Sequence, residues 1–252
     1  MATVEPGATE PAHAADRAQL APRPEHHHVD VRSGSARAAV FGVSDGLVSN
    51  VSLILGVAGA NPGAGIVRLA GLAGLISGAV SMAAGEYVSM RAQNELLQRE
   101  LDVERRELRR NPNVEIVELT QIYQSRGIDP DLSRELAQEV MRDPEVALQA
   151  HAREELGIDP NQLGSPRGAA VSSFLSFAIG ALVPLLPWFF GSGTGAAVAS
   201  VVFGFTACAI VGALLARFTG RSVLFSASRQ VAIATVAGGV TFFIGKLVGV
   251  GI

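Results

Sequence analysis

Five apolar segments, each about long enough to cross a lipid bilayer, constrain the fold of this chain more than any other feature of its sequence. A helix needs about 20 apolar residues to cross a hydrocarbon core of roughly 30 Å. Backbone groups inside a bilayer must hydrogen-bond to one another, so each segment is predicted to be helical. The segments are residues 38–60, 66–90, 169–190, 196–216 and 231–252. The sequence therefore predicts an all-α, polytopic membrane protein with five transmembrane helices.

Basic residues near the ends of these segments predict how the chain is oriented. Lys and Arg are enriched in cytoplasmic loops, so the side with more of them is expected to be cytoplasmic. One side would carry Arg32, Arg37, Arg91, Arg99, Arg167, Arg217, Arg221 and Arg229. The other side would carry only Arg68 and Lys246. We therefore expect a cytoplasmic N-terminus and a C-terminus on the opposite side.

A charged segment between the second and third spans is expected to form a cytoplasmic helical domain over residues 93–165. From residue 93 to residue 157 the chain has 15 acidic and 9 basic residues. This acidic balance argues against nucleic acid as a partner and favours cations. Three helices are expected: a continuation of the second span that stops at Asn111-Pro112, a helix over 114–125, and a helix that runs from Asp129-Pro130 to Gly157. The third has Asp131 and Ser133 as candidate caps, and Asp143-Pro144 could break it in two.

The remaining parts of the chain are assigned from their composition. Residues 35–92 are expected to hold the first two transmembrane helices and residues 166–252 the last three. Residues 1–34 are polar, lack a signal peptide and are expected to form a disordered cytoplasmic tail that includes His26-His27-His28. The lone Cys208 excludes an intramolecular disulfide and is expected to be a small buried hydrophobe. There is no Walker A or His-Glu-x-x-His motif, so we expect neither an enzyme nor a resident cofactor.

Asp45 is a carboxylate inside the first apolar segment. At a helix centre it costs about 2.5–3.5 kcal/mol to insert, so such a residue usually faces a water-filled path, an ion or a partner group. Met82 and Glu86 are four residues apart in the second segment and share one helix face. Counted from the flanking arginines, Asp45 lies about 12 Å deep, Met82 about 13 Å and Glu86 about 8 Å. Asp45 and Met82 are therefore expected to meet at one level, with Glu86 nearer the cytosol.

The ligand types at these positions favour a transition metal. Carboxylates suit divalent cations, and the thioether of Met82 favours transition metals over Mg²⁺ or Ca²⁺. Ser49 and Asn50, one turn beyond Asp45, could add neutral oxygen ligands. The alternative is that Met82 is core packing and Glu86 an interfacial residue.

The cytoplasmic helices repeat acidic residues at helical spacing, which brings them to common faces. The candidate metal ligands are Glu100, Glu104 and Glu107 on the first helix, Glu115 and Glu118 on the second, and His151 and Glu155 on the third. Carboxylates that converge from three helices would form a cation-loading site. The alternative is a solvated helix whose glutamates pair with neighbouring arginines.

Two membrane motifs carry a resemblance to a known family. VFGVSDGLVSNVSLILGVAGA at 40–60 and LISGAVSMAAGEYVSMRAQ at 75–93 strongly resemble the vacuolar iron transporter family, which includes the nodulin-21-like proteins. The resemblance extends to the acidic insert through PNVEIVELTQIYQSRGID and HAREELGID, and to the three later spans. It covers the chain from about Ser35 to the end.

The resemblance implies a homodimer that moves Fe²⁺, and often Mn²⁺, out of the cytosol in exchange for protons. It implies transport ligands at Asp45 and Met82, with Glu86 near the path, and a metal-binding domain in the insert. The positions that match the acidic residues of that domain are Glu104, Glu107, Glu115, Glu118 and Glu155. His151 is a departure, because some relatives carry methionine there. Imidazole still binds these ions, although its affinity should fall in acid.

We therefore expect a proton antiporter for Fe²⁺, with Mn²⁺ and Zn²⁺ as further candidate ions, in a bacterial inner membrane. In this hypothesis the acidic helices capture ions and Glu86 helps them enter, after which Asp45 and Met82 hold them within the membrane. The alternative function is a membrane-anchored protein that binds, senses or buffers metal without moving it.

Overall fold

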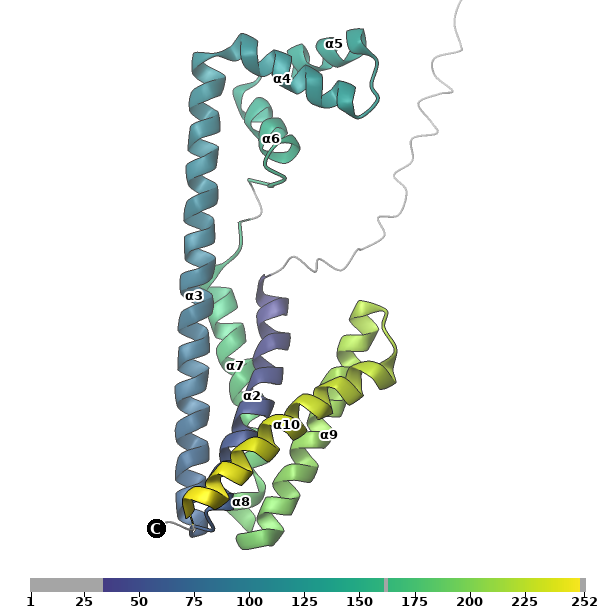
Figure 1. The fold of residues 1–252 in the computed structure, drawn as a ribbon. Helices are drawn as coiled ribbons and strands as arrows, with labels where there is room; N and C mark the ends of the chain where they lie inside the picture. Colours follow the sequence, from purple (N-terminus) through teal and green to yellow (C-terminus); the bar gives the residue numbers. More distant parts are fainter. Residues whose placement is uncertain (1–33, 161–162, 250–252) are drawn as a thin grey trace, which may run out of the picture. The chain divides into compact units, whose positions relative to one another are not determined.

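In the computed structural model, the described residues, 34–160 and 163–249, form helices and connections without a strand (Figure 1). The helices are α2 (Gly34–Gly59), α3 (Ala64–Arg110), α4 (Pro112–Ser125), α5 (Pro130–Val140), α6 (Pro144–Glu154), α7 (Pro166–Leu185), α8 (Pro187–Phe190), α9 (Gly193–Thr219) and α10 (Val223–Gly249). The prediction of an all-α protein is confirmed for this part of the chain. The predicted tail, up to residue 33, and its histidine cluster lie outside the described residues.

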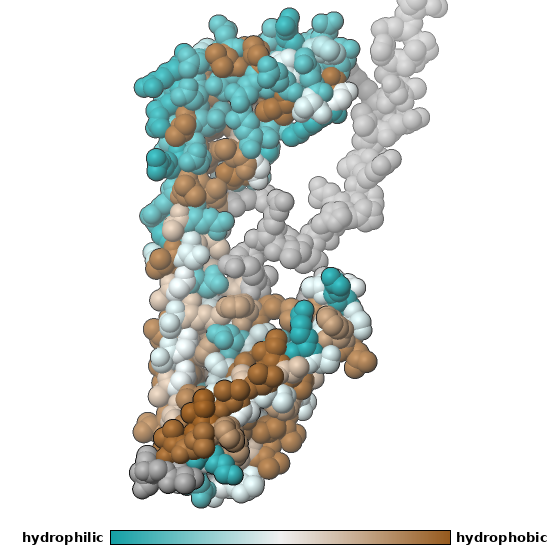
Figure 2. Space-filling model, in the orientation of Figure 1, coloured by the Kyte–Doolittle hydropathy of each residue, from teal (hydrophilic) through white to brown (hydrophobic). Residues whose placement is uncertain are grey.

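Five of these helices are long and apolar enough to cross a membrane, which confirms the predicted number. They are Ala38–Gly59 of α2, the helix α3, the helix α7, Gly193–Arg217 of α9, and the helix α10. Large apolar side chains such as Leu69, Ile179 and Leu224 are exposed on them, as is typical of helices that contact lipid. Figure 2 shows brown, hydrophobic side chains over these helices and teal, hydrophilic ones over α4, α5 and α6.

The last transmembrane helix begins eight residues earlier than its apolar segment. It starts at Val223 rather than Val231. Arg229 therefore lies inside α10, and the prediction that Arg229 lies in the connection between the last two spans was wrong. The apolar run that begins at Val223 extends the helix, and the guanidinium of Arg229 lies 5.9 Å from the centre of the Phe225 ring. Gly220, with a φ of +65°, ends α9 in the left-handed conformation that glycine adopts without strain.

The helix α7 packs against both α2 and α3. Glycines allow its backbone to approach that of α2 closely. A Cβ atom at Gly46 of α2 would overlap the carbonyl group of Phe177, and a Cβ atom at Gly180 of α7 would overlap the carbonyl group of Val43. Contact through small residues is the usual way in which helices associate in a bilayer, where no hydrophobic effect drives them together. It fixes the positions of α2 and α3 around the pocket described below.

One unbroken helix, α3, carries both the second span and the first acidic helix. It has 47 residues and ends at Arg110, where Asn111 and Pro112 stop it as predicted. Its C-terminal part contacts α4 and α6. A single helix therefore carries Met82 and Glu86 as well as Glu104.

The third predicted acidic helix is broken into α5 and α6. Pro144 is the first residue of α6, and the carboxylate of Asp143 accepts hydrogen bonds from the backbone N–H groups of Glu145 and Val146. In the same way Asp129 caps α5, so the predicted caps Asp131 and Ser133 were wrong. An aspartate directly before proline provides an oxygen for the N–H groups at the start of a helix, whereas residues inside the first turn cannot.

Small apolar cores hold the acidic helices together. Leu119 and Tyr123 of α4 pack with Ala137 of α5, and Leu101 of α3 packs with Leu148 and Ala152 of α6. In the membrane helices Cys208 is fully buried beside Leu47 and Ala234, in keeping with its expected role as a small hydrophobe.

Candidate metal centres

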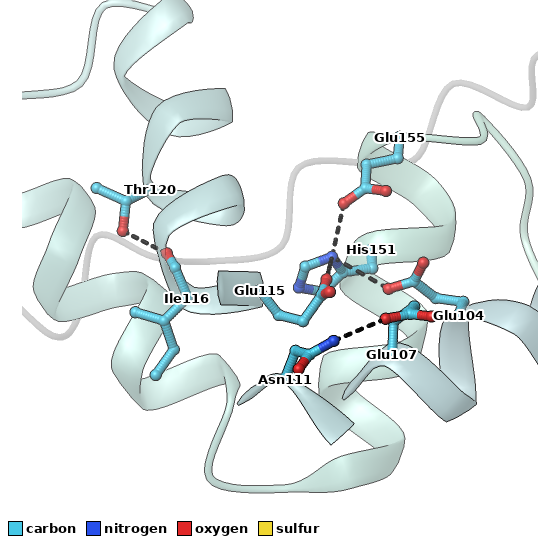
Figure 3. Close-up of polar contacts among 8 residues, drawn as sticks. All are labelled: Glu104, Glu107, Asn111, Glu115, Ile116, Thr120, His151 and Glu155. Carbon is cyan, nitrogen blue, oxygen red and sulfur yellow. Dashed lines mark hydrogen bonds and ion pairs between the residues drawn. The ribbon is translucent and has the colours of Figure 1, made fainter. Parts of the chain in front are cut away.

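Three acidic helices bring four metal-ligating side chains together around His151 (Figure 3). Its Nδ1 atom lies 2.7 Å from Oε1 of Glu155, 3.3 Å from Oε1 of Glu104 and 3.6 Å from Oε2 of Glu115. The imidazole is fully buried, and the Glu104 and Glu115 side chains are 11% and 8% exposed. We call these four residues the acidic cluster.

Three members of the acidic cluster, Glu104, Glu115 and His151, lie next to buried apolar residues that fix their direction. Glu104 lies one turn after Leu101 on α3, and Glu115 lies one turn before Leu119 on α4. His151 lies between Leu148 and Ala152 on α6, which pack against α3. Residues three or four apart share a helix face, so packing of the apolar cores turns these polar side chains inward.

The electrostatics of the acidic cluster disfavour three negative charges without a cation. Burial and the charge of Glu155 raise the pKa of Glu104 to about 7, against a partial lowering by His151. Burial is also the main cause of the raised pKa of Glu115. In addition, Oε1 of Glu104 and Nε2 of His151 are buried without a hydrogen-bond partner. A bound cation would relieve both the repulsion and part of this unmet hydrogen bonding.

The spacing of the donor atoms fits a metal ion. One ligand atom from each of the four residues lies within 4.8 Å of every other. Ligands on opposite sides of an ion that is bound at about 2.0–2.2 Å are roughly 4.0–4.4 Å apart, so small side-chain movements suffice. Three carboxylates and an imidazole are donors that Fe²⁺, Mn²⁺ and Zn²⁺ accept.

The other predicted cytoplasmic ligands surround this group or lie apart from it. The carboxylate of Glu107 accepts a hydrogen bond of 3.0 Å from Asn111, and its charge raises the pKa of Glu115. The exposed Glu118 raises the pKa of both Glu104 and Glu115. Glu100 is not among the grouped ligands. The alternative was that the glutamates pair with neighbouring arginines. Arg105 instead forms an ion pair with Asp102, at 2.9 Å.

Within the membrane helices, Asp45 and Met82 line one pocket of about 430 Å³. Its walls come from residues four apart on α2 and from a face of α3 that repeats every three or four residues, closed by one aromatic ring of α7. The lining residues are Phe41, Asp45, Ser49, Asn50, Leu53, Gly74, Ser77, Gly78, Ser81, Met82 and Phe177. Asp45 is their only ionisable member. The structure therefore brings Asp45 and Met82 together, whereas Glu86 is not part of the lining and lies one turn farther along α3.

Sequence reasoning missed two hydroxyl groups of this pocket, those of Ser77 and Ser81. Ser77 and Ser81 lie four residues apart on the face of α3 that carries Met82, and this spacing was the signal that could have identified them. Ser49, a predicted candidate ligand, donates its hydroxyl proton to the backbone carbonyl of Asp45 at 2.5 Å.

Comparisons with known proteins find relatives over most of the chain. The chain is 38% identical over 223 residues to a vacuolar iron transporter of Acanthamoeba castellanii, covering 85% of this chain and 79% of that protein. It is 32% identical to vacuolar iron transporter 1 of Oryza sativa subsp. japonica, covering 88% and 90% of the two chains. For vacuolar iron transporter 1 of Arabidopsis thaliana the identity is 32%, covering 84% and 85%. These names refer to a vacuole, so the expectation of a bacterial inner membrane has no support from them.

The sequence model of the VIT family matches residues 36–246, which include the first four candidate membrane spans, most of the fifth and the acidic cluster. The resemblance inferred from the two membrane motifs is thereby confirmed. The chain is a multi-pass membrane protein that belongs to the VIT family.

Proposed function

We propose that this protein moves Fe²⁺, and also Mn²⁺, out of the cytosol in exchange for protons. The observation that carries the proposal is the shared pocket of Asp45 and Met82, because a carboxylate and a thioether line one space between the membrane helices. Intramembrane carboxylates mark ion paths, and a thioether beside one favours a transition metal. The names of the relatives, which refer to iron, support the same ion class.

The acidic cluster captures the ion in this proposal. Glu104, Glu115 and Glu155 supply charge, and His151 adds a nitrogen donor. Because the pKa of Glu104 is about 7, binding of a cation near neutral pH displaces a proton from the cluster. The ion then passes along the α3 side of the protein, past Glu86, to the pocket.

Inside the pocket, Asp45 holds either a cation or a proton. A divalent ion bound to one carboxylate and neutral donors leaves that carboxylate able to take up a proton when the ion departs. Alternation between the two occupants couples outward metal movement to inward proton movement. The predicted cytoplasmic side of α2 and α3, inferred from the flanking arginines, sets this direction.

A homodimer is part of the proposal, because the single chain exposes its intramembrane carboxylate. Asp45 and Phe41 are exposed on the α2 surface of one subunit. A carboxylate that faced lipid there would be costly, so a second copy that covers this face would shield it and complete the path. The orientation and the subunit number are both open to direct measurement by cross-linking and by labelling of each side.

Flux measurements test the proposal. Proteoliposomes are loaded with a metal-sensitive dye and exposed to Fe²⁺ under anaerobic conditions, Mn²⁺ or Zn²⁺, with and without a pH gradient. We expect Fe²⁺ and Mn²⁺ flux that the gradient accelerates and that Asp45→Ala abolishes. Flux that survives this substitution would overturn the role given to Asp45.

A second function, metal binding or sensing without transport, is favoured by the acidic cluster alone, since it needs no pocket. It predicts that the purified protein binds these ions while proteoliposomes show no flux. If the purified protein binds the ions but proteoliposomes move none of the three, the binding or sensing function would replace transport.

A further inference from the structure

Asn50 is a buried polar residue of α2 whose side chain has one satisfied atom and one unsatisfied atom. The residue is 2% exposed. Its Nδ2 atom donates a hydrogen bond of 2.5 Å to the backbone carbonyl of Ala181 on α7. Its Oδ1 atom is buried and has no hydrogen-bond partner in the protein. Buried acceptors without a partner are rare and costly, so this oxygen calls for an explanation.

The hydrogen bond to Ala181 fixes which way the amide points. A backbone carbonyl can only accept, so the group that faces Ala181 has to be the NH₂ end of the amide. The carbonyl end of the amide is then turned away from α7. This end belongs to a residue that lines the pocket of Asp45 and Met82.

The opposite wall presents a glycine to this oxygen. Gly74 of α3 lies across the pocket, and a Cβ atom built on it would come within 3.2 Å of Oδ1 of Asn50. Any larger residue at position 74 would therefore press against the oxygen. Glycine here places no side chain of α3 against the buried Oδ1 atom.

We infer that Oδ1 of Asn50 is a neutral oxygen ligand for the ion in this pocket, beside the carboxylate of Asp45 and the thioether of Met82. The inference rests on the proposed transport function and extends its site by one residue. An amide oxygen adds a hard donor without adding charge. A transport site needs a moderate affinity, because an ion has to bind well enough to enter and weakly enough to leave.

The inference predicts a change in ion preference when the oxygen is removed. Carbonyl and carboxylate oxygens suit Mn²⁺, whereas thioethers favour softer ions and Zn²⁺. Asn50→Leu keeps the size of the side chain and removes the oxygen. Loss of this ligand should raise the KM for Fe²⁺ by about tenfold, the lower end of what metal-site substitutions typically cause. Inhibition of Fe²⁺ flux by Mn²⁺ should weaken more than inhibition by Zn²⁺.

Two further variants separate the oxygen from the hydrogen bond. Gly74→Ala leaves Asn50 and its bond to Ala181 in place but puts a methyl group against Oδ1, at the expense of a shift of the Leu53 side chain. It should change the KM and the ion preference in the same direction. Ser200→Ala is the matched control, since Ser200 is 1% exposed, donates to the carbonyl of Pro184 on α7 and lies outside the pocket lining. It should lower thermal stability without changing ion preference.

The outcomes distinguish this inference from the proposed function. If wild-type proteoliposomes move no ion, the transport function fails and the inference fails with it. If the wild type moves Fe²⁺ but both Asn50→Leu and Gly74→Ala keep its KM and its order of ion preference, the inference alone is overturned. If Asn50→Leu does not fold, as judged by gel filtration in detergent, Gly74→Ala decides the matter.

Discussion

The Nδ1 atom of His151 lies 2.7 Å from Oε1 of Glu155, four residues farther along the chain, and this pair closes the acidic cluster from the α6 side. The C-terminal end of α6 thus holds the His151 nitrogen among the carboxylates. The imidazole is fully buried, so the protein surrounds it on all sides.

Substitution of this histidine should weaken metal capture. His151→Leu is expected to lower Mn²⁺ affinity by at least about tenfold, since it removes a donor from the centre of the group. His151→Met, which offers a thioether, should retain more affinity for Fe²⁺ than for Mn²⁺. Titration calorimetry on the full chain in detergent measures both. Glu145→Gln, at an exposed carboxylate in the first turn of the same helix, is the control and should bind as the wild type does.

The pKa of Glu104 predicts how metal-free stability depends on pH. It is raised from 4.5 in the unfolded chain to about 7 in the folded protein, so the folded state binds a proton more tightly. The stability associated with this proton is fully present below pH 4.5 and is lost as the pH rises through about 7. Glu104→Gln keeps the neutral state at every pH. In chelator, it should therefore raise the melting temperature relative to wild type at pH 8 and change it little at pH 4.5.

The same proton should compete with the metal. Affinity for Mn²⁺ is expected to rise between pH 5.5 and pH 7.5 in the wild type and to depend less on pH in Glu104→Gln. A wild-type affinity that is constant across this range would contradict the assignment of Glu104 as a ligand that must lose its proton.

The close approach of α2 and α7 predicts a strong effect of a single methyl group. In Gly46→Ala, the new Cβ atom would overlap the carbonyl of Phe177, a backbone group that cannot move aside easily. Overpacking of this kind costs about 1–3 kcal/mol, so the melting temperature and the yield of folded protein should both fall. Gly85→Ala is the control, because a Cβ atom there meets nothing within 4 Å. It should be neutral or slightly stabilising, and equal behaviour of the two variants would count against the packing described.

Much of the fold could be predicted from the sequence because it depends on local patterns. Runs of apolar residues of bilayer length locate the spans, and proline after asparagine or aspartate ends one helix and begins another. The start of α10 was misplaced because Arg229 interrupts its apolar run, although an arginine can cover part of a neighbouring ring without leaving a helix. A charge is thus a weaker boundary signal than a glycine in the left-handed conformation such as Gly220.

The sites could be predicted only to the level of a helix face. Glu100, Glu104 and Glu107 share one face of α3, but only Glu104 meets His151, because the contact depends on where α6 packs. The orientation of the Asn50 amide depends on Ala181, which is 131 residues away in the chain. Spacing along one helix cannot show contacts with another helix, so these assignments required the packed structure.

The unbroken helix α3 connects the pocket mechanically to the acidic cluster. Met82 in the pocket and Glu104 in the acidic cluster are on one rigid rod, about 33 Å apart at 1.5 Å per residue. Over that length, a tilt of about 5° displaces one end by about 3 Å relative to the other, a distance comparable to a whole metal–ligand contact. If the acidic helices move when they bind an ion, a tilt of α3 would carry the Met82 wall of the pocket with it.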